Sequence, residues 1–466
     1  MSTTRALVIG GGITGLSAAF TLQEEARRRG LPLDVTLVEA AREPGGHART
    51  LAEDGFLVEG GPNGFLAREP ETLALVDELG LGARLVEARP EAKRRFIVRG
   101  GRLRRVPESP PTFLTTDALS LRGKIRLAGE VFAPGPPPGV DETVYDFARR
   151  RIGAEAAEML VDAAVSGISA GDSRALSVAA QFPVMVEMER EHGGLIKAML
   201  ARKKAGPGGS RLLSFDAGLG TLTGALADRL GPRLCTATAV RSIEQRPGGW
   251  RVETDRGPLD AGEVVLALAA RAAAPLIAPL DWTLADALGR IPYSGVSVVA
   301  LAYRQEDLPR ELDGYGYLVT RPERLATLGV VWESSLFPGR APAGMALLRA
   351  FLGGARQPDV VREGEAGAEA VTREELRRVM GITAEPARRW VFRWPHAIAQ
   401  YTVGHLERMA IIRDRADRHR GLTLCGTSYD GVSFNHAIVG GRRAARRVLE
   451  RVEAASGETA AVRRAG

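Results

Sequence analysis

The chain has 466 residues, more than a single hydrophobic core ordinarily organises, so we expect two or three closely packed domains. Its 45% hydrophobic and 26% charged residues are typical of a globular protein and exclude a disordered or fibrous chain. The formal net charge of +7 suits an anionic partner, although an arginine-rich composition alone gives the same balance. Because the sequence has no recognisable nucleic-acid module, we expect no nucleic-acid partner.

We expect neither a membrane-spanning helix nor a signal peptide. The richest apolar run, residues 264–280, is interrupted by Arg271, Pro275 and Pro279, and the first strand begins within a few residues of the start. Cys235 and Cys425 form no CxxC pair, which indicates thiols in a reducing compartment.

A nucleotide-binding unit opens the chain. The apolar run 6–9 reads as a buried parallel strand, and the loop Gly10-Gly11-Gly12-Ile13-Thr14-Gly15 leads from it into a helix. Glycines permit a tight turn and a close approach of the backbone to a pyrophosphate, which the helix N-terminus attracts. A second strand, 35–38, ends at Glu39, whose carboxylate can hold ribose hydroxyls. This unit of about thirty residues predicts a dinucleotide site.

The residues after Glu39 favour a flavin over a nicotinamide. Arg42 can face a diphosphate, and Gly45 and Gly46 let the backbone pass close to a cofactor, although the same residues elsewhere more often form an ordinary turn. A short strand then leads into a glycine-rich corner at residues 60–64.

The middle of the chain changes character several times. Residues 88–140 are basic and then rich in proline, residues 141–205 have a helical pattern, and residues 206–209 are a break. A helical segment, a strand pair and the apolar run 264–268 follow, and we expect this run to return to the nucleotide-binding sheet. Strands and turns then alternate through residue 400.

The C-terminal part supplies a second helix N-terminus. A strand ending near Cys425 enters the turn 426–435 and then a helix, and we expect a frayed tail from residue 457. Such a helix N-terminus can stabilise electron density at a flavin pyrimidine. The two-ended arrangement is typical of flavin oxidases with a discontinuous FAD domain.

Several motifs in order give the chain a family resemblance from about residue 5 to 452. It resembles the oxygen-dependent protoporphyrinogen oxidases of the monoamine-oxidase-like flavoprotein superfamily, and is most similar to the myxobacterial form. The motifs are Gly-Pro-Asn-Gly-Phe-Leu (61–66), Ala-Lys-Arg-Arg-Phe (92–96), Gly-Ile-Ser-Ala-Gly-Asp (167–172), Phe-Pro-Gly-Arg-Ala-Pro (337–342), Gly-Gly-Ala-Arg (353–356) and Phe-Arg-Trp-Pro-His-Ala-Ile-Ala-Gln-Tyr (392–401).

The resemblance implies an α/β and α+β fold in three parts. These are a discontinuous Rossmann-like FAD-binding domain (1–87, 207–270 and 401–456), a mostly helical, basic, membrane-binding domain (88–206) and a mixed-sheet substrate domain (271–400), with a disordered tail at 457–466. A homodimer is also implied.

The resemblance further implies which residues bind the ligands. FAD would be held non-covalently by Gly10, Gly11, Gly12, Ile13, Thr14, Gly15, Glu39, Ala40, Arg42, Gly46, Gly61, Pro62, Asn63, Gly64, Val240, Trp394, Gly426, Val432, Ser433 and Phe434. Arg95 would pair with a substrate propionate, and the Gly167 carbonyl would face the pyrrole N–H groups. Leu318, Val331 and Phe351 would sandwich the macrocycle. From the sequence alone these three residues are more simply ordinary core.

The basic run 93–105 holds seven cations and no acid. It is either a solvated charged edge, or a propionate clamp that also adheres to anionic lipid, with Pro110–Leu114 dipping into the headgroups. The second interpretation predicts a cytoplasmic protein, peripheral on the inner face of the cell membrane.

The chemistry is expected to depend on the cofactor. The six histidines have no metal-ligand spacing, no Ser/His/Asp set stands out, and the family has no well-defined acid–base residue, so we predict no metal and no catalytic side chain. Three two-electron cycles, in which a meso carbon gives a hydride to the flavin and O2 becomes hydrogen peroxide, would convert protoporphyrinogen IX to protoporphyrin IX.

Other functions stay open at this point. The first is the same chemistry on coproporphyrinogen III, which carries four propionates instead of two. A flavin amine oxidase or carotenoid desaturase would share both FAD signatures, and a non-enzymatic flavoprotein would retain them without turnover. The role of His47, directly after Gly46, is also open.

Overall fold

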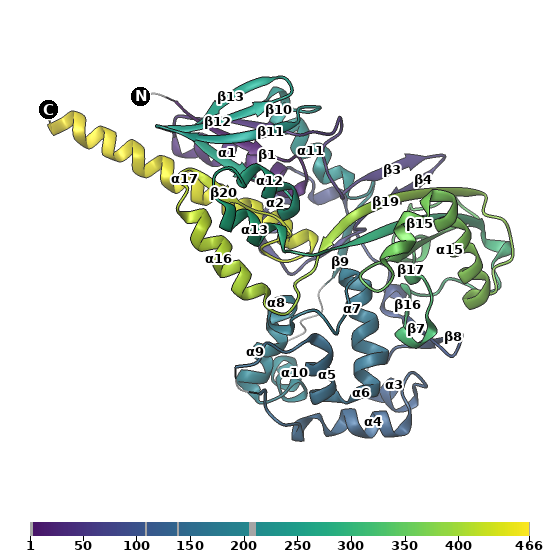
Figure 1. Ribbon diagram of the computed structural model, residues 1–466. Coiled ribbons are helices and arrows are strands. Elements are labelled where there is room, and N and C mark those ends of the chain that lie inside the picture. Colours follow the sequence, from purple (N-terminus) through teal and green to yellow (C-terminus); the bar gives the residue numbers. More distant parts are fainter. Residues whose placement is uncertain (1–2, 108–109, 138, 205–210, 466) are drawn as a thin grey trace.

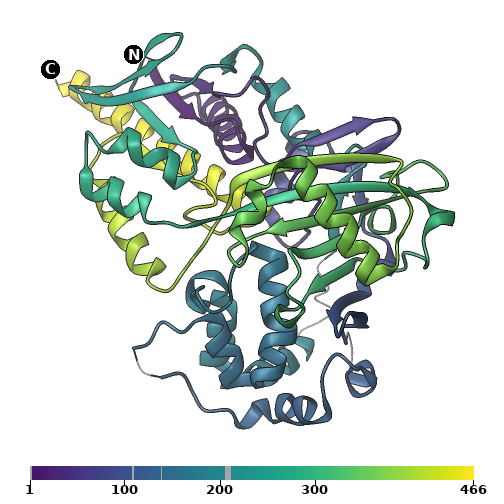
Figure 2. The ribbon, with the colours of Figure 1, turned by 45° about the vertical axis from the view of Figure 1, so that its right-hand side comes forward.

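The computed structural model describes residues 3–107, 110–137, 139–204 and 211–465 (Figure 1). A parallel sheet with its helices lies at one end, a seven-stranded sheet lies beside it, and a group of helices lies below both (Figures 1 and 2).

The parallel sheet is assembled from distant segments of the chain. Its strand order is β10 (Leu234–Cys235), β2 (Leu33–Val38), β1 (Thr4–Ile9), β14 (Glu263–Leu266), β20 (Leu422–Leu424). The strands are near-continuous apolar runs because helices or a second sheet cover both faces, as parallel sheets require. The expected return of the 264–268 run to this sheet is confirmed, since β14 pairs with β1.

Each face of the parallel sheet has its own cover. Ala6 and Val8 face a core formed with α1 (Ile13–Arg29), α2 (Pro70–Glu78), α11 (Gly220–Leu230) and α17 (Phe434–Ala465). Leu7 and Ile9 face a core formed with α12 (Ala270–Ile277), α13 (Trp282–Gly289), α16 (His405–Asp417) and the antiparallel strands β11 (Val240–Arg246), β12 (Gly249–Thr254) and β13 (Gly257–Ala261).

The frayed tail expected from residue 457 is not what the structure has. The helix α17 continues to Ala465, because residues 457–465 include three alanines and two arginines, which favour a helix, and no proline. In Figure 1 this last part of α17 projects away from the rest of the chain.

The second sheet has seven strands in the order β19 (Arg388–Ala399), β15 (Tyr293–Arg304), β18 (Met345–Gly353), β17 (Thr327–Trp332), β16 (Gly316–Val319), β7 (Arg95–Arg99), β8 (Arg102–Arg105). All neighbours are antiparallel except β16 and β7. One face packs on α15 (Gly364–Met380). Short sheets, β3 (Thr50–Glu53) with β4 (Phe56–Glu59), and β5 (Phe65–Leu66), β9 (Leu212–Phe215) and β6 (Leu85–Glu87), connect it to the parallel sheet.

The domain boundary expected at residue 88 is therefore misplaced. The strands β7 and β8 belong to the seven-stranded sheet, because β7 pairs with β16 and with β8, and Phe96 and Val98 are buried in the core of that sheet. The basic run 93–105 is thus mainly an edge of this sheet, and it contacts the helical group through Ile97 and Arg99.

The helical group comprises α3 (Pro110–Thr115), α4 (Leu121–Ala128), α5 (Val144–Ile152), α6 (Ala154–Ala156), α7 (Asp162–Ser169), α8 (Val178–Gln181), α9 (Pro183–His192) and α10 (Leu195–Lys204). A buried ion network fixes it: Arg150 bonds Glu142 and Glu189, and Arg151 bonds Glu130 and Glu189. The expected fold class, with its discontinuous nucleotide domain, is confirmed.

Helices α1 and α17 approach so closely at Gly441 that a methyl group there would lie 2.2 Å from the Thr14 carbonyl oxygen. We expect Gly441→Ala to lower the free energy of unfolding by about 1–3 kcal/mol, because the helices must separate. Gly224→Ala is the matched control, since Gly224 is an exposed residue of α11 with open space around it. This variant should raise the free energy of unfolding by about 0.5–1 kcal/mol. Thermal unfolding of both variants measures this; equal stabilities would contradict the close contact.

The buried His405 stacks on Tyr401 with ring centroids 4.0 Å apart, and burial, then Arg408 and Arg413, lowers its pKa to about 4. Between the unfolded value of about 6.5 and pH 4 the unfolded chain takes up a proton that the folded protein does not, so stability falls as the pH falls. Between about pH 7 and about pH 5, the titration of His405 should lower the free energy of unfolding by about 2 kcal/mol.

His405→Phe keeps the stacking and should remove that part of the pH dependence, which thermal unfolding at the two pH values measures. Replacing the exposed His192 with Asn should leave the pH dependence as in the wild type. If His405→Phe has the same pH dependence as the wild type, the buried neutral histidine is not its source.

Candidate functional site

The segments predicted to hold a dinucleotide meet at one edge of the parallel sheet. The strands β1, β2, β14 and β20 run parallel, so the loop 10–15, Glu39 and the turn 426–434 all follow their carboxyl ends. Both α1 and α17 begin there, which directs two helix N-termini at the same region.

The loop 10–15 fits a bound pyrophosphate. A methyl group at Gly15 would lie 1.8 Å from the Gly10 carbonyl oxygen, so this turn admits no side chain. At Gly12, the N-cap of α1, no heavy atom lies within 4 Å of such a methyl group. The loop is therefore tight where it packs and open where a phosphate would approach.

Glu39 lies at this loop as expected. Its carboxylate accepts the Gly11 N–H at 2.5 Å and the Ala41 N–H at 2.7 Å, and its carbonyl accepts the Thr238 N–H at 2.8 Å. The last bond brings the segment that leads to Val240 beside it. Ala40, Arg42 and Gly46 are exposed on the same loop.

The corner 60–64 is held from the seven-stranded sheet. One Arg349 nitrogen, Nη1, donates to the carbonyls of Glu59 (2.8 Å) and Gly61 (2.6 Å), and Trp394 Nε1 donates to the Gly60 carbonyl (2.6 Å). His47 packs edge-on against Trp394 with ring centroids 4.7 Å apart, so the structure gives it a packing role. Three successive carbonyls are thus turned toward the sheet.

Two buried ion pairs lie beneath this corner. Arg349 Nη2 is 2.7 Å from Glu333 Oε1, to which Asn63 Nδ2 also donates at 3.1 Å. Arg340 is 3.8 Å from Glu59. Burial raises the pKa of the Glu59 carboxyl, and the positive charge of Arg340 offsets part of that rise. The sequence analysis named Asn63 and, within a motif, Arg340, but it did not single out Glu59, Glu333 or Arg349. A charged residue at 349 within the apolar strand β18 was the available signal.

The turn 426–434 is held by a tyrosine. Tyr401 donates its hydroxyl to the Thr427 carbonyl at 2.7 Å and accepts the Gly431 N–H at 2.8 Å. Ser433 Oγ accepts the His436 N–H and caps α17, while the Phe434 side chain is buried in the core. Only the backbone of Phe434 therefore remains for a cofactor.

Four predicted substrate residues share one face of the seven-stranded sheet. One row of paired positions across this face consists of Arg95, Gly316, Val331 and Arg349. The next row of the same face includes Leu318, Gly329 and Phe351. Trp394 extends this face on β19. Leu318, Val331, Phe351 and Trp394 are only partly buried, as residues lining an open site are.

The fifth predicted residue, Gly167, faces the same place from α7. A methyl group there would lie 2.4 Å from Leu318 Cδ2, so the helix backbone comes close to the sheet. Gly167 is in the last turn of α7, where carbonyls lack helical partners. In the described chain no N–H beyond the helix donates to its carbonyl.

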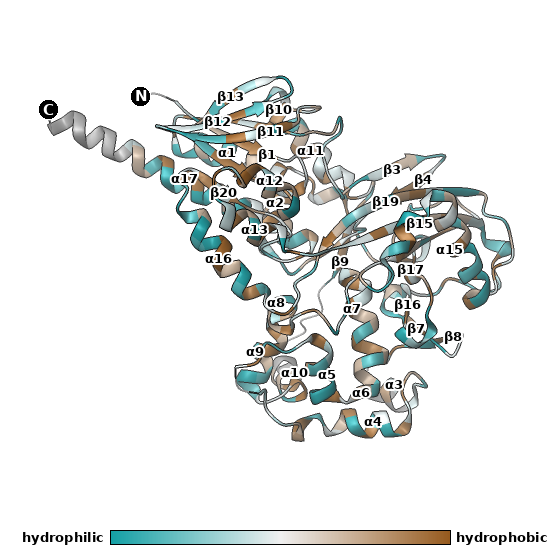
Figure 3. Ribbon diagram, in the orientation of Figure 1, coloured by the Kyte–Doolittle hydropathy of each residue, from teal (hydrophilic) through white to brown (hydrophobic). Residues whose placement is uncertain are grey.

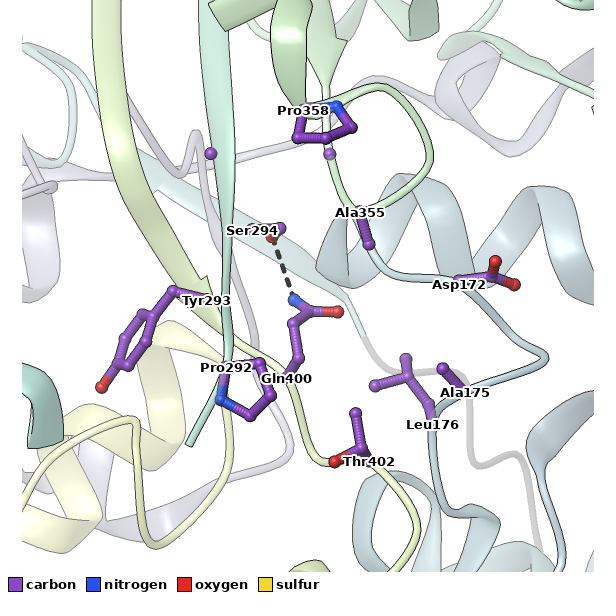
Figure 4. Close-up of a pocket in the computed structure, with 12 residues that line it drawn as sticks. Asp172, Ala175, Leu176, Pro292, Tyr293, Ser294, Ala355, Pro358, Gln400 and Thr402 are labelled. Carbon is purple, nitrogen blue, oxygen red and sulfur yellow. Dashed lines mark hydrogen bonds between the residues drawn. The ribbon is translucent and has the colours of Figure 1, made fainter. Parts of the chain in front are cut away.

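Both ends of α7 are held by polar contacts, the first at Asp162 and the last at Ser169. Asp162 accepts from Arg321 at 2.9 Å and from Arg356 at 3.0 Å, and Gln400 Nε2 donates to the Ser169 carbonyl at 2.9 Å and to Ser294 at 3.0 Å. A cavity of about 240 Å³ lies beside these contacts, and Asp172, Ser294 and Gln400 are among the residues that line it (Figure 4). The polar contacts at the two ends set the direction of α7, and hence of Gly167.

The cations of the run 93–105 differ in their partners. Arg94 pairs with Asp313 at 3.0 Å, Arg99 with Glu155 at 2.9 Å, and Arg104 with Asp117. Arg95 is exposed, and its guanidinium lies 5.4 Å from the centre of the Tyr315 ring. Arg95 is therefore held by an aromatic ring and keeps its charge for an incoming carboxylate.

Within the described residues no group of three or more His, Cys, Asp or Glu side chains is arranged to hold a metal ion. The same residues include no helix long and apolar enough to cross a membrane.

The chain matches the family described as flavin containing amine oxidoreductase over residues 13–449. It is similar to the coproporphyrinogen III oxidase of Bacillus subtilis (strain 168), 32% identical over 457 residues that cover 94% of this chain and 96% of that protein. It is also similar to the chloroplastic protoporphyrinogen oxidase of Oryza sativa subsp. japonica, 34% identical over 476 residues that cover 95% of this chain and 88% of that protein.

Solved structures agree with this assignment. One from Exiguobacterium sp. 255-15 has a TM-score of 0.85 at 28% identity and covers 97% of this chain and 100% of that chain. Cyclohexylamine oxidase from Brevibacterium oxydans IH-35A, with a TM-score of 0.70 at 19% identity over 97% of this chain and 100% of that chain, shares the fold. The expected superfamily, with protoporphyrinogen oxidases among its members, is confirmed. The chain belongs to the flavin-containing amine oxidoreductase family and is an oxidoreductase whose cofactor is FAD.

Proposed function

We propose that this oxidoreductase converts protoporphyrinogen IX to protoporphyrin IX, with O2 as the acceptor and hydrogen peroxide as the second product. One observation carries the proposal: a sheet face with partly open apolar residues adjoins the flavin corner and has an exposed arginine, Arg95, at its edge. A flat macrocycle with carboxylates on one side matches this arrangement. The names of the relatives support the same substrate class.

The residues predicted to bind FAD fit that cofactor. The loop 10–15 and Glu39 would hold the pyrophosphate and ribose, and the corner 61–64, Trp394 and the turn 426–434 would hold the ring end, with Val240 at the nucleotide end. When bound, FAD supplies the two-electron acceptor of each oxidation cycle and passes the electrons to O2.

The protein's own residues would bind and orient the substrate. Arg95 pairs with a propionate, and Leu318, Val331 and Phe351 enclose the macrocycle and exclude water. The carbonyl of Gly167, at the negative end of α7, accepts pyrrole N–H bonds and orients the ring. Conversion of a porphyrinogen to a porphyrin removes six hydrogens, which requires three successive cycles.

A substrate with two propionates fits this site better than one with four. Of the cations in the run 93–105, Arg94, Arg99 and Arg104 already have carboxylate partners, and the inward-facing Arg349 is paired with Glu333. Additional propionates deeper in the site would be buried against Leu318, Val331 and Phe351 without a free cation, which is costly. Coproporphyrinogen III is the alternative, because one relative carries that name.

Porphyrin fluorescence on incubation with each porphyrinogen and O2 tests the proposal. We expect a larger kcat/KM for protoporphyrinogen IX than for coproporphyrinogen III. Preference for the tetracarboxylate would establish the alternative, and peroxide release from an amine without any porphyrin fluorescence would refute both.

Arg95→Ala should raise KM for protoporphyrinogen IX by about tenfold or more, with kcat and FAD content retained, because a charge-assisted contact to the propionate is lost. The KM of Arg95→Lys should lie between those of the wild type and Arg95→Ala, since an ammonium keeps the charge but lacks the bidentate geometry. The control is Arg256→Ala, which removes an exposed cation from the turn between β12 and β13, a part of the chain that contributes no residue to the proposed substrate site. If KM is unchanged in Arg95→Ala, Arg95 does not bind the substrate.

We also propose that the protein is a cytoplasmic homodimer. Its helical group would attach it peripherally to the inner face of the cell membrane, which is anionic. The apolar edge consists of Leu121, Ile125, Phe132, Met199 and Leu200, which are 59–89% exposed. It lies on α4, on α10 and on the turn Gly129–Phe132 between them, and Figure 3 shows apolar and polar residues interspersed along α4. The exposed cation Arg122 adjoins it.

The run 93–105 is a weaker candidate for the lipid contact than this apolar edge, because several of its cations are paired with acids. Of the segment Pro110–Leu114, the side chains of Pro110, Pro111 and Leu114 lie outside the described residues.

The double variant Ile125→Ser, Phe132→Ser should bind phosphatidylglycerol vesicles at least about tenfold more weakly, because two large apolar side chains no longer leave water. Trp282→Ser, which removes a 73% exposed residue on α13, should bind as the wild type does. Co-sedimentation measures the binding. Equal binding of all three proteins would contradict the assigned edge.

A further inference from the structure

The pair formed by Arg349 and Glu333 is a buried charge at the cofactor corner that the proposed chemistry does not use. Both side chains are 1–2% exposed. Arg349 contacts the corner directly through the Glu59 and Gly61 carbonyls, and its guanidinium carbon lies 4.9 Å from the centre of the Phe351 ring. The cation is thus placed between the flavin corner and a proposed substrate wall.

Glu333 balances this cation asymmetrically. Only its Oε1 atom bonds Arg349 and Asn63, while Glu333 Oε2 and Arg349 Nε have no hydrogen-bond partner among the described residues. An ion pair that served packing alone would satisfy both oxygens, because unpaired buried polar atoms are costly. In the second pair, Arg340 with Glu59, both carboxylate oxygens are bonded, by Thr50 Oγ1 and by the Leu219 N–H, although Arg340 Nε and Nη1 have no hydrogen-bond partner among the described residues. The two charges of this pair cancel.

We infer that the Glu333–Arg349 pair sets the electron affinity of the bound flavin. A cation favours the reduced flavin, which carries more negative charge than the oxidised form, and Glu333 masks part of that effect. Both residues are positioning residues that act through their contacts with Glu59, Gly61 and Asn63 at the corner 60–64. The inference rests on the proposed placement of FAD at that corner.

The midpoint potential of the flavin tests the inference. In Glu333→Gln the Arg349 charge is unmasked, so at a fixed ambient potential the ratio of reduced to oxidised flavin should rise about tenfold, which is ~30 mV for a two-electron couple. Arg349→Gln leaves Glu333 unbalanced, so the potential should fall. The charge-neutral double variant should return to the wild-type potential, and it serves where a single variant loses its flavin.

Glu130→Gln is the matched control, because Glu130 and Arg151 form an equally buried pair within the helical group; its potential should equal that of the wild type. Flavin-loaded Glu333→Gln and Arg349→Gln with unchanged potentials, or with shifts of the same sign, would overturn the inference, as would a shifted potential in the double variant. That result would leave the proposed oxidation intact, whereas failure to oxidise a porphyrinogen by a wild-type protein with normal flavin would refute the proposed function alone.

Discussion

The two halves of the site depend on one set of hydrogen bonds, those that Arg349 and Trp394 donate to three successive carbonyls, Glu59, Gly60 and Gly61. The corner that receives them belongs to the nucleotide-binding part, and the two donors belong to the seven-stranded sheet. Because a buried guanidinium needs acceptors, and a buried carbonyl needs a donor, neither part can shift without leaving polar groups unpaired. A cofactor held at the corner, as we propose, is therefore fixed relative to the proposed substrate face.

The substrate face follows from the same geometry. Period-two alternation on β16, β17 and β18 directs Leu318, Val331 and Phe351 to the side that carries Arg349, while Tyr317, Val330 and Ala350 point to the core under α15. The helix α7 closes the site from the other side, and its direction is fixed by Asp162, Arg356 and Gln400. The Gly167 carbonyl thus owes its position to polar contacts that are distant from it in sequence.

The sequence predicted the nucleotide-binding sheet well because its signals are local. The loop 10–15 and Glu39 lie within one strand–helix–strand unit, and each has a physical reason for its residue type. The sequence failed where long-range pairing decides. Nothing local shows that β7 pairs with β16, so the run 93–105 was grouped with the helices. The helix α17 continues through the expected tail to Ala465, in keeping with the helix propensity of its alanines and arginines.

The candidate site divides in the same way. The family resemblance pointed to Arg95, Gly167 and Phe351, but not to the ion pair beside them. Arg349 and Glu333 are 16 residues apart and meet because the chain passes from β17 through α14 (Glu333–Leu336) and back into β18. A single charged residue at an inward position of an apolar strand is a weak signal by itself. In the folded chain it identifies the contact between cofactor corner and substrate face.

The central claim is that the sheet face presents a porphyrinogen directly to the bound flavin. Anaerobic mixing of the purified protein with protoporphyrinogen IX, followed by the absorbance of the oxidised flavin, tests it without O2 chemistry. We predict that the flavin band bleaches in a single turnover and returns when O2 is admitted. A flavin band that persists with protoporphyrinogen IX and with coproporphyrinogen III, but bleaches with an amine, would contradict the account.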